Sequence, residues 1–449
     1  MSEAPSPDLS FMLRVSLIAA LGLAVRLAYV ISRRNVDVWG DAFFYHHGAN
    51  LLVHGKGFIA PFPYFAFHIR VQAADHPPLY LLFLAIPSAL HLDSPLMHMV
   101  WSSLLGSGTV IVSGFLGRRV AGRRTGLLAA LLVAIYPNVW VYDGVLLSET
   151  LAIFVATLAV LLAYRAWERP TYGRIASLGA ACGAAALARS ELVLLIPALL
   201  IPVALCARSL SLGVRLQRLG LGALVALVVV APWVGYNVVR FEHPVLLSSQ
   251  LEPTLAAANC RDTYHGSSLG LLTVTCLTGT SAKTDQSVTA ELLRHRVAHC
   301  VRSNLSRVPI VMAVRVGRVV GLYRPTQQVN VDVLLEGRER WLAITGLISF
   351  YCVAAGAIVG AVVLRRRRAP PLFPLLVLPG IVIVTVALTY GTTRFRAAAE
   401  TSLAVLAAIA LDALWTRLAA SRRPQPAREA ARVGSGPCSG SSVTSSERS

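Results

Sequence analysis

Long apolar stretches recur along most of the chain and are separated by short polar connections. Many of them have about the 20 residues that an α-helix needs to cross a bilayer core of roughly 30 Å. The stretches occupy residues 11–32, 97–117, 125–140, 146–166, 174–188, 191–207, 219–237, 341–364, 371–390 and 401–419. This pattern predicts an all-α polytopic membrane protein with a bundle of about 10–11 transmembrane helices. The first stretch, Phe11 to Ile31, is too long for a secretory signal and has no cleavage site after it, so we expect it to be retained.

Composition supports the membrane class. The 449 residues are 55% hydrophobic and 14% charged, whereas soluble domains average about 25% charged residues. The formal net charge is +19, but the arginines form short clusters between apolar stretches, where orientation signals lie. Neither a basic helix nor an aromatic platform indicates a nucleic-acid surface, so nucleic acid is not expected as a partner.

The arginine clusters also predict which face each connection occupies. Placing the clusters in the cytoplasm puts the 33–96 loop and the 238–340 segment outside a multi-pass protein of the plasma membrane. Arg33 and Arg34 oppose this orientation, and the later clusters outnumber them. His76 to Leu92 is short and contains Pro87; if it crossed, the later clusters would face outward, so we predict a re-entrant or interfacial segment.

These assignments divide the chain into five parts. They are a cytoplasmic N-terminus at 1–10, a transmembrane module at 11–237 with the first outer loop at 33–96, an extracytoplasmic segment at 238–340, C-terminal transmembrane helices at 341–419, and a disordered cytoplasmic tail at 420–449. The tail is predicted from its Ser-, Pro-, Arg- and Gly-rich composition. The sequence indicates no oligomeric state.

Three cysteines, Cys260, Cys276 and Cys300, fall in the extracytoplasmic segment, where oxidising conditions favour a disulfide. We favour Cys260–Cys276 because the residues between them form a compact, turn-rich sequence, and Cys300 remains an alternative partner. No CxxC spacing is present, and we predict no cofactor; a divalent metal would lack a recognisable ligand cluster.

Asp41 is the first candidate for chemistry. It lies in WGDAFFYHHGANLL, just after the first span, with Tyr45, His46 and His47 nearby. A loop carboxylate of this kind could be simply solvated. It could equally serve as a general base, because a pocket against the bilayer would exclude water from the hydroxyl that it deprotonates.

Two further outer connections carry ionisable residues. YDGVLLSE contains Asp143, which could merely cap a helix, and Glu149, which lies within the next span and needs a partner there. ALARSELVLL contains Arg189, which could extend to the interface or hold a phosphate.

The last outer connection, YGTTRFRAAAE, contains Arg394 and Arg396. Two arginines at the outer end of a span contradict an inside-positive bias, which favours phosphate binding over orientation. His76, in ADHPPLY, is either a ligand contact or an ordinary residue before a helix that starts at Pro77.

Together these residues predict carboxylates and arginines at one membrane face. Arginines would neutralise a lipid phosphate as it leaves, and a carboxylate would activate an incoming hydroxyl. A transporter or flippase of lipid-linked substrates is the alternative, and it would predict inverted repeats and charges at mid-membrane. We find no convincing repeat. A scaffold whose outer segment binds a partner is a third possibility, without specific support.

The order of motifs resembles the GT-C membrane glycosyltransferases, specifically the family 39 or protein-mannosyltransferase-like group that includes the aminoarabinose transferases. The resemblance covers most of residues 10–420 and rests on WGDAFFYHHGANLL, HPPLYLLFLA, GRRVAGRRTGLLAALLVAIYP, YDGVLLSETL, GAACGAAALARSELVLLIP, APWVGYNVVRF and TYGTTRFR. Two features depart from the group: Ala42 stands where many protein mannosyltransferases have a second carboxylate, and no proline follows Arg396.

The resemblance implies a GT-C bundle with a long first outer loop, and an inverting transfer of a sugar from a polyprenyl-phosphate donor to a hydroxyl at the outer face. It implies that Asp41 is the catalytic base, with Asp143 and Glu149 as further catalytic carboxylates. The residues that would contact phosphate or substrate are Tyr45, His46, His76, Arg189, Arg394 and Arg396. Lys56 and Lys283 are the only lysines, which fits a high-GC bacterial genome and favours a polyprenyl over a dolichyl carrier.

Overall fold

The computed structural model describes residues 8–35, 37–206, 210–281, 283–368 and 370–421. Within these ranges the secondary structure is helical, apart from one isolated bridge between Ile59 and Gln72. Among the described residues, those up to Asp412 form one compact unit, and those from Ala413 onward belong to a second. The all-α prediction is therefore confirmed for the described residues, whereas the predicted disordered tail lies almost entirely outside them.

Among the described residues, six helical segments are long and apolar enough to cross a membrane, or seven if a bent pair of helices counts as one span. They are α1 (Leu9–Ser32), α5 (Pro95–Ala121), α8 (Glu149–Glu168), α11 (Leu212–Arg240), α17 (Arg340–Arg367) and α19 (Ala397–Ser421), the last preceded by a 3-10 turn at Thr393–Arg396. Each corresponds to one of the apolar stretches in the sequence. The chain is thus a polytopic membrane protein.

One expected span, 125–140, is broken into two helices. α6 (Arg123–Ile135) and α7 (Pro137–Val145) meet at an angle of 43°. The break lies at Tyr136, whose backbone is extended with ψ of 112°. The ring of the following Pro137 disfavours the helical conformation at Tyr136, so the helix ends there and a new one begins at the proline.

Other expected spans are shorter than a full crossing. They are α9 (Tyr172–Ala188), the helical segment Ser190–Leu205 that ends in α10 (Ile201–Leu205), and α18 (Phe373–Leu388). Pro197 and Pro202 lie in the second of these, where the chain passes from a 3-10 turn through a π turn into α10. α4 (Leu79–Ala89) has 11 residues and a length of about 16 Å, too short to cross a bilayer.

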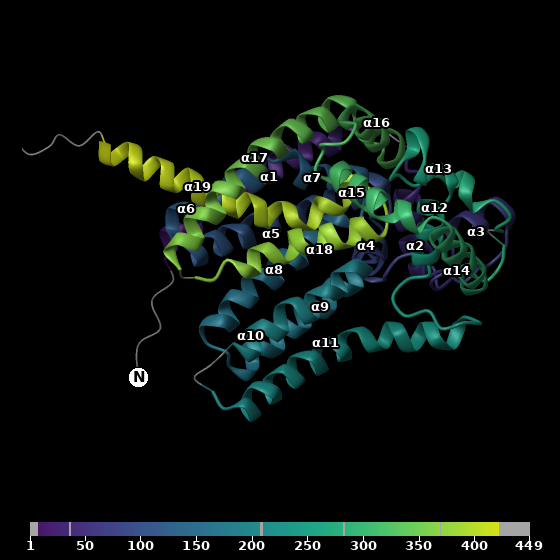
Figure 1. The fold of residues 1–449 in the computed structure, drawn as a ribbon, viewed down its shortest axis with the longest axis horizontal. Coiled ribbons are helices and arrows are strands. Elements are labelled where there is room, and N and C mark those ends of the chain that lie inside the picture. Colours follow the sequence, from purple (N-terminus) through teal and green to yellow (C-terminus); the bar gives the residue numbers. More distant parts are fainter. Residues whose placement is uncertain (1–7, 36, 207–209, 282, 369, 422–449) are drawn as a thin grey trace, which may run out of the picture. The chain divides into compact units, whose positions relative to one another are not determined.

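The long helices pack as a bundle in the first unit. α5 contacts α1, α6, α7 and α8, while α9 lies between α8 and α11 (Figure 1). α9 and α11 approach closely at Gly179, where an added Cβ would lie 2.2 Å from the carbonyl oxygen of Gly222. Small residues allow such backbone contact, which supplies packing energy between helices that share an apolar environment.

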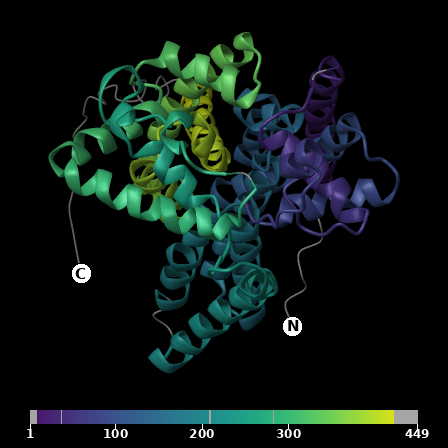
Figure 2. The same ribbon diagram turned by 90° about the vertical axis from the view of Figure 1, so that its right-hand side faces the viewer.

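Two segments far apart in sequence gather at one end of this bundle (Figures 1 and 2). The first loop contributes α2 (Asp41–Val53) and α3 (Pro61–Phe67). The 238–340 segment contributes α12 (Leu251–Ala258), α13 (Arg261–Tyr264), α14 (Gln286–Ser303), α15 (Val308–Val319) and α16 (Pro325–Glu336). The backbone N–H of Ser249 donates to the carbonyl of Ala74 over 2.8 Å, which fastens the two segments together.

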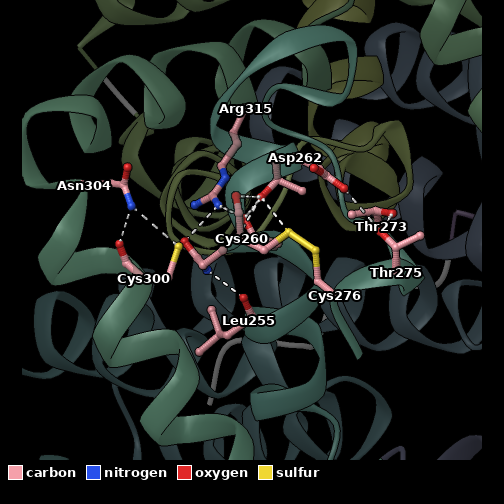
Figure 3. The surroundings of a disulfide bond; sticks show 12 residues. Leu255, Cys260, Asp262, Thr273, Thr275, Cys276, Cys300, Asn304 and Arg315 are labelled. Atoms are coloured by element: carbon pink, nitrogen blue, oxygen red, sulfur yellow. Dashed lines mark hydrogen bonds between the residues drawn. A yellow bond between two sulfur atoms is a disulfide. The ribbon is translucent and has the colours of Figure 1, made fainter. Parts of the chain in front are cut away.

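A disulfide joins Cys260 to Cys276, the pairing that the sequence favoured (Figure 3). It closes the loop between α12 and α14. Cys300 is a free thiol on α14, where the side chain of Asn304 donates to its carbonyl oxygen over 2.8 Å. The disulfide therefore belongs to the segment that closes one end of the bundle.

Candidate active site

Arg394 joins the two carboxylates that the sequence placed at the ends of different helices. Its Nη1 donates to Oδ2 of Asp41 over 2.6 Å, and its Nη2 donates to Oε2 of Glu149 over 3.3 Å. Its Nε also donates to Oε1 of Glu149. The planar guanidinium has donors in a fixed fork, so one arginine holds both acids in a defined geometry.

Asp41 is the first residue of α2, where the partial positive charge of the helix N-terminus favours a carboxylate. Its side chain is 34% exposed, and Nε2 of His76 lies 3.5 Å from its Oδ1. Burial disfavours the charged form, but the Arg394 guanidinium and the His76 ring outweigh burial and hold the pKa of Asp41 well below its ordinary value of 3.8. The carboxylate is therefore ionised and still reachable.

His76 is held beside Asp41 by aromatic packing. Its ring stacks on Tyr45 with centroids 5.0 Å apart and meets Phe44 edge-on. Tyr45 is buried and lies one turn along α2 from Asp41, which places phenol, imidazole and carboxylate together. Three of the residues predicted from the first loop and the ADHPPLY motif thus meet at one point.

Glu149 begins α8 and is fully buried. It forms salt bridges with Arg189 as well as with Arg394. Arg189 lies at the end of α9, where its Nε also donates to Glu191 over 2.5 Å. A buried carboxylate needs such partners, because an unpaired charge out of water is very costly. Glu149 therefore fixes the positions of both arginines.

Asp41 and the two arginines line a cavity of about 860 Å³. Its lining combines residues of the 238–340 segment with the predicted site residues Asp41, Tyr45, His76, Arg189 and Arg394. Part of its wall is apolar and is formed by Leu246, Leu247, Leu251, Leu272, Val331 and Leu335. A cavity of this size with a few convergent polar groups is typical of a small-molecule site. The combination of arginines and leucines suits a ligand with an anionic head and an apolar tail.

The loop that carries Arg394 is held by residues that the sequence did not single out. The hydroxyl of Thr393 donates to Oδ2 of Asp332 over 2.8 Å, and the hydroxyl of Thr392 donates to Glu336 over 3.4 Å. Asp332 and Glu336 are four residues apart on α16, so they lie on one face of that helix. The spacing of these acids in VNVDVLLEGRER was visible in the sequence, but their partners were not.

Asp143 lies away from this cavity and has a partner of its own. Its Oδ2 is 3.0 Å from Nε of Arg26 on α1, and both side chains are almost completely buried. Its Oδ1 accepts a hydrogen bond of 2.7 Å from the hydroxyl of Thr150, which is next to Glu149. Asp143 thus contacts the start of α8 but not the cavity. Arg26, a charge within an apolar stretch, was the visible signal for this pair.

Two other predicted contacts also lie outside the cavity wall. His46 is buried, with its Nδ1 3.2 Å from Nδ1 of His98. Arg396 is buried, forms a salt bridge with Glu400, and donates from Nη1 to the carbonyl of Val319 over 2.8 Å. Of the paired arginines in TTRFR, therefore, Arg394 faces the cavity and Arg396 faces the bundle.

In the described part of the chain, no three His, Cys, Asp or Glu side chains form a group that could hold a metal ion. Asp41 and Glu149 are both engaged by arginine, and cations of that kind compete with a metal for the same carboxylate oxygens.

Comparisons with known proteins agree with this architecture. Residues 75–236 match the family model described as dolichyl-phosphate-mannose-protein mannosyltransferase. The archaeal oligosaccharyltransferase AglB from Archaeoglobus fulgidus, solved with an inhibitory peptide and a dolichol-phosphate, is similar over 90% of this chain and 51% of its own, with a TM-score of 0.51 and 16% identity. The matched family model covers less than half of this chain, and the likeness to the archaeal oligosaccharyltransferase is one of fold.

Two more solved structures are similar to this chain. The Archaeoglobus fulgidus oligosaccharyltransferase in complex with Zn and sulfate has a TM-score of 0.50 and 16% identity, with 88% of this chain and 49% of that chain covered. ArnT from Cupriavidus metallidurans, bound to undecaprenyl phosphate, has a TM-score of 0.43 and 16% identity, with 87% and 77% covered. The TM-score of 0.43 for ArnT is below the level from which a shared fold follows.

The chain spans about half the length of the oligosaccharyltransferases that it matches. At 16% identity these matches show a common fold. A search of curated proteins gave no significant match.

Proposed function

We propose that this protein transfers a sugar from a polyprenyl-phosphate donor to a hydroxyl acceptor at the outer face of the plasma membrane. The observation that carries the proposal is the bridge from Asp41 through Arg394 to Glu149, because Asp41 and Arg394 line the cavity of about 860 Å³. A base candidate and two cations lie in one site, as a displacement at a phosphate-linked sugar requires.

Arg189 and Arg394 would bind the donor phosphate in this proposal. Both line the cavity, and guanidinium groups match phosphate oxygens with paired hydrogen bonds. Glu149 holds them in place before the donor arrives and limits their mutual repulsion. The apolar side of the cavity, with Leu246 and Leu335 among its residues, would take the first isoprene units of the carrier. The carrier bound to AglB is a dolichol-phosphate.

Asp41 would act as the general base. It takes the proton from the acceptor hydroxyl, the oxygen attacks the anomeric carbon, and the bond from that carbon to the phosphate oxygen breaks. The polyprenyl phosphate leaves with the bonding electrons, and its charge is stabilised by Arg189 and Arg394. A single displacement of this kind inverts the anomeric configuration.

Donor binding would also make Asp41 a stronger base. In the free protein Arg394 holds the pKa of Asp41 well below its ordinary value. A phosphate that shares the Arg394 donors would weaken this effect, so the pKa of Asp41 would rise toward its ordinary value when the donor is in place. The base would then be activated only in the complex with donor.

The remaining predicted residues take supporting roles in the proposal. His76 and Tyr45 form the wall beside Asp41 and would orient the sugar. Asp143 would act through the start of α8, because Thr150 connects it to the neighbour of Glu149. His46 and Arg396 would stabilise α2 and the arginine loop by their buried contacts.

Mass spectrometry of envelope glycolipids and glycoproteins from a strain that lacks the protein tests the reaction. The proposal predicts that a polyprenyl-phosphate sugar accumulates and that one envelope component loses a sugar. Expression of the wild-type chain should restore that component. An unchanged set of envelope glycans together with an unchanged donor pool would contradict the proposal.

A further inference from the structure

A second cavity, of about 350 Å³, adjoins the larger one at the candidate base. The two cavities have five lining residues in common, namely Asp41, Asp75, His76, Ser249 and Gln250. Asp41 therefore stands at a wall that both cavities share. A reaction that joins two substrates at Asp41 needs access from two sides, and this arrangement provides it.

The two cavities differ in whether cations line them. The larger cavity is lined by Arg189, Arg294 and Arg394, together with the carboxylates Asp41, Asp75, Glu191, Glu252, Glu291 and Glu336. No arginine or lysine is among the described residues that line the smaller one, where the ionisable groups are Asp41, Asp75 and His76. Phosphate recognition in proteins depends on cationic or backbone donors, so the larger cavity suits the donor phosphate and the smaller one does not.

The smaller cavity has one aromatic side and one side of neutral polar groups. Phe43, Phe44 and Phe62 line the first. The second consists of Ser249, Gln250, Ser281, Thr284, Gln286 and Thr289. Hydroxyls and amides both donate and accept hydrogen bonds, as the hydroxyls of a sugar do, and aromatic rings pack against the apolar C–H face of a pyranose.

The polar side is fixed by a hydrogen-bonded hub at Gln286, the first residue of α14. Its Oε1 accepts from the backbone N–H of Ala74 over 2.9 Å and from the hydroxyl of Ser249 over 2.7 Å. Its Nε2 donates to Oδ2 of Asp75 over 2.7 Å. These contacts pin the 238–340 segment to the loop that carries His76, so the wall is set before a ligand binds.

We propose that the smaller cavity binds the acceptor, and that the acceptor is an uncharged carbohydrate whose reactive hydroxyl points at Asp41. This inference rests on the proposed function and adds the acceptor class to it. A phosphorylated lipid headgroup would meet the carboxylates of Asp41 and Asp75 without a cation on that side, and like charges disfavour such a ligand. A neutral glycan meets only groups that it can pair with.

Adding a positive charge to the polar wall tests this inference. Thr289 lines the smaller cavity from α14, and its Oγ1 is 3.1 Å from that of Thr284. Thr289→Arg would fill the cavity and place a cation in it. Ser303→Arg is the matched control, because Ser303 is exposed on the same helix, about 21 Å along its axis, and lines neither cavity.

The two variants and the wild-type chain are each combined with envelope membranes from the deletion strain, which supply donor and acceptor. The rate of sugar transfer is followed by mass spectrometry, and binding of undecaprenyl phosphate to the purified full chain is measured separately. We expect Thr289→Arg to lower the transfer rate by about tenfold or more and to change undecaprenyl phosphate affinity by less than about twofold. Ser303→Arg should match the wild type in both measurements.

The outcomes separate the two proposals. Loss of transfer with intact lipid-phosphate binding, and a product whose new sugar is attached to an uncharged glycan, supports the acceptor site. Unchanged or faster transfer by Thr289→Arg overturns it, as does a product in which the sugar is attached to a phosphorylated lipid or to a protein side chain. If Thr289→Arg also loses lipid-phosphate binding, the transfer rate is measured for Thr289→Val instead. Unchanged transfer by Thr289→Val would also overturn the acceptor site. Absence of any sugar transfer by the wild-type chain refutes the proposed function itself.

Discussion

Arg394 Nη1 lies 2.6 Å from Oδ2 of Asp41, although 353 residues separate the two along the chain. The contact joins the start of α2 to the turn before α19, and the same guanidinium reaches Glu149 at the start of α8. Three helix ends therefore depend on one arginine. In the proposed reaction this group positions the base and binds the leaving phosphate.

Replacement of Arg394 should weaken donor binding more than replacement of any exposed arginine. Charge-assisted hydrogen bonds contribute roughly 1.5–3 kcal/mol each, so Arg394→Ala should lower affinity for undecaprenyl phosphate by about tenfold or more. Arg394→Lys should recover little, because an ammonium cannot hold two carboxylates in the fork geometry. Arg302→Ala, at an exposed position on α14, is the control. Equal affinities for the Arg394 variants and the wild type would exclude Arg394 from the phosphate site.

Protonation of Asp41 should not limit activity near neutral pH. The folded-state pKa of Asp41 lies well below 3.8, so its carboxylate contributes stability that is present above pH 3.8 and is lost as the pH falls through the folded-state pKa. Melting temperatures measured from pH 7 down to pH 3 should fall less steeply for Asp41→Asn than for the wild type at the acid end. Identical slopes would show that Asp41 is not held ionised by Arg394 and His76.

Gly106 on α5 should tolerate no side chain, because it faces the buried pair of Arg26 and Asp143. A Cβ at Gly106 would lie 2.6 Å from Nε of Arg26 and 2.7 Å from Oδ2 of Asp143. Overpacking costs typically about 1–3 kcal/mol, so Gly106→Ala should lower the melting temperature of the purified protein by several degrees. Gly220→Ala on α11, where nothing lies within 4 Å, should be neutral or stabilising. If Gly106→Ala had the melting temperature of the wild type, the Arg26–Asp143 pair would have to move easily to make room for the added methyl group.

The two lysines test the predicted orientation. Lys56 lies in the first loop and Lys283 in the 238–340 segment, and both are expected outside the cell. A membrane-impermeant amine reagent applied to intact cells should therefore label the protein, and the variant with Lys56→Arg and Lys283→Arg should remain unlabelled. Labelling that occurs only after the cells are permeabilised would reverse the orientation and place the cavity on the cytoplasmic side.

The apolar stretches predicted most of the helices because hydrophobic length depends on the local sequence alone. The break at Tyr136 was equally local, since Pro137 disfavours a helix before it. The sequence also predicted that Asp41, Glu149, Arg189 and Arg394 lie at one face, and the structure brings them into contact. Which acid pairs with which arginine depends on distances between distant helices, which composition and spacing do not encode.

The groups that the sequence left out are those whose partners are remote. Arg26 was a charge within an apolar span, which is a visible signal, but its pairing with Asp143 required the packing of α1 against α5 and α7. Asp332 supports the arginine loop through Thr393, and nothing in its local sequence distinguishes it from a solvated helix residue. Conversely, Arg396 resembled Arg394 in the sequence, yet its position two residues on directs it into the bundle.

The central claim, that Asp41 deprotonates the acceptor, is tested most directly by the transfer rate of Asp41→Asn with donor bound. The amide keeps the size of the side chain but cannot accept the proton, so we expect at least about a hundredfold loss of transfer while undecaprenyl phosphate still binds. Asp93→Asn, at an exposed acid that lines neither cavity, should transfer sugar at the wild-type rate. Wild-type turnover by Asp41→Asn would contradict the account.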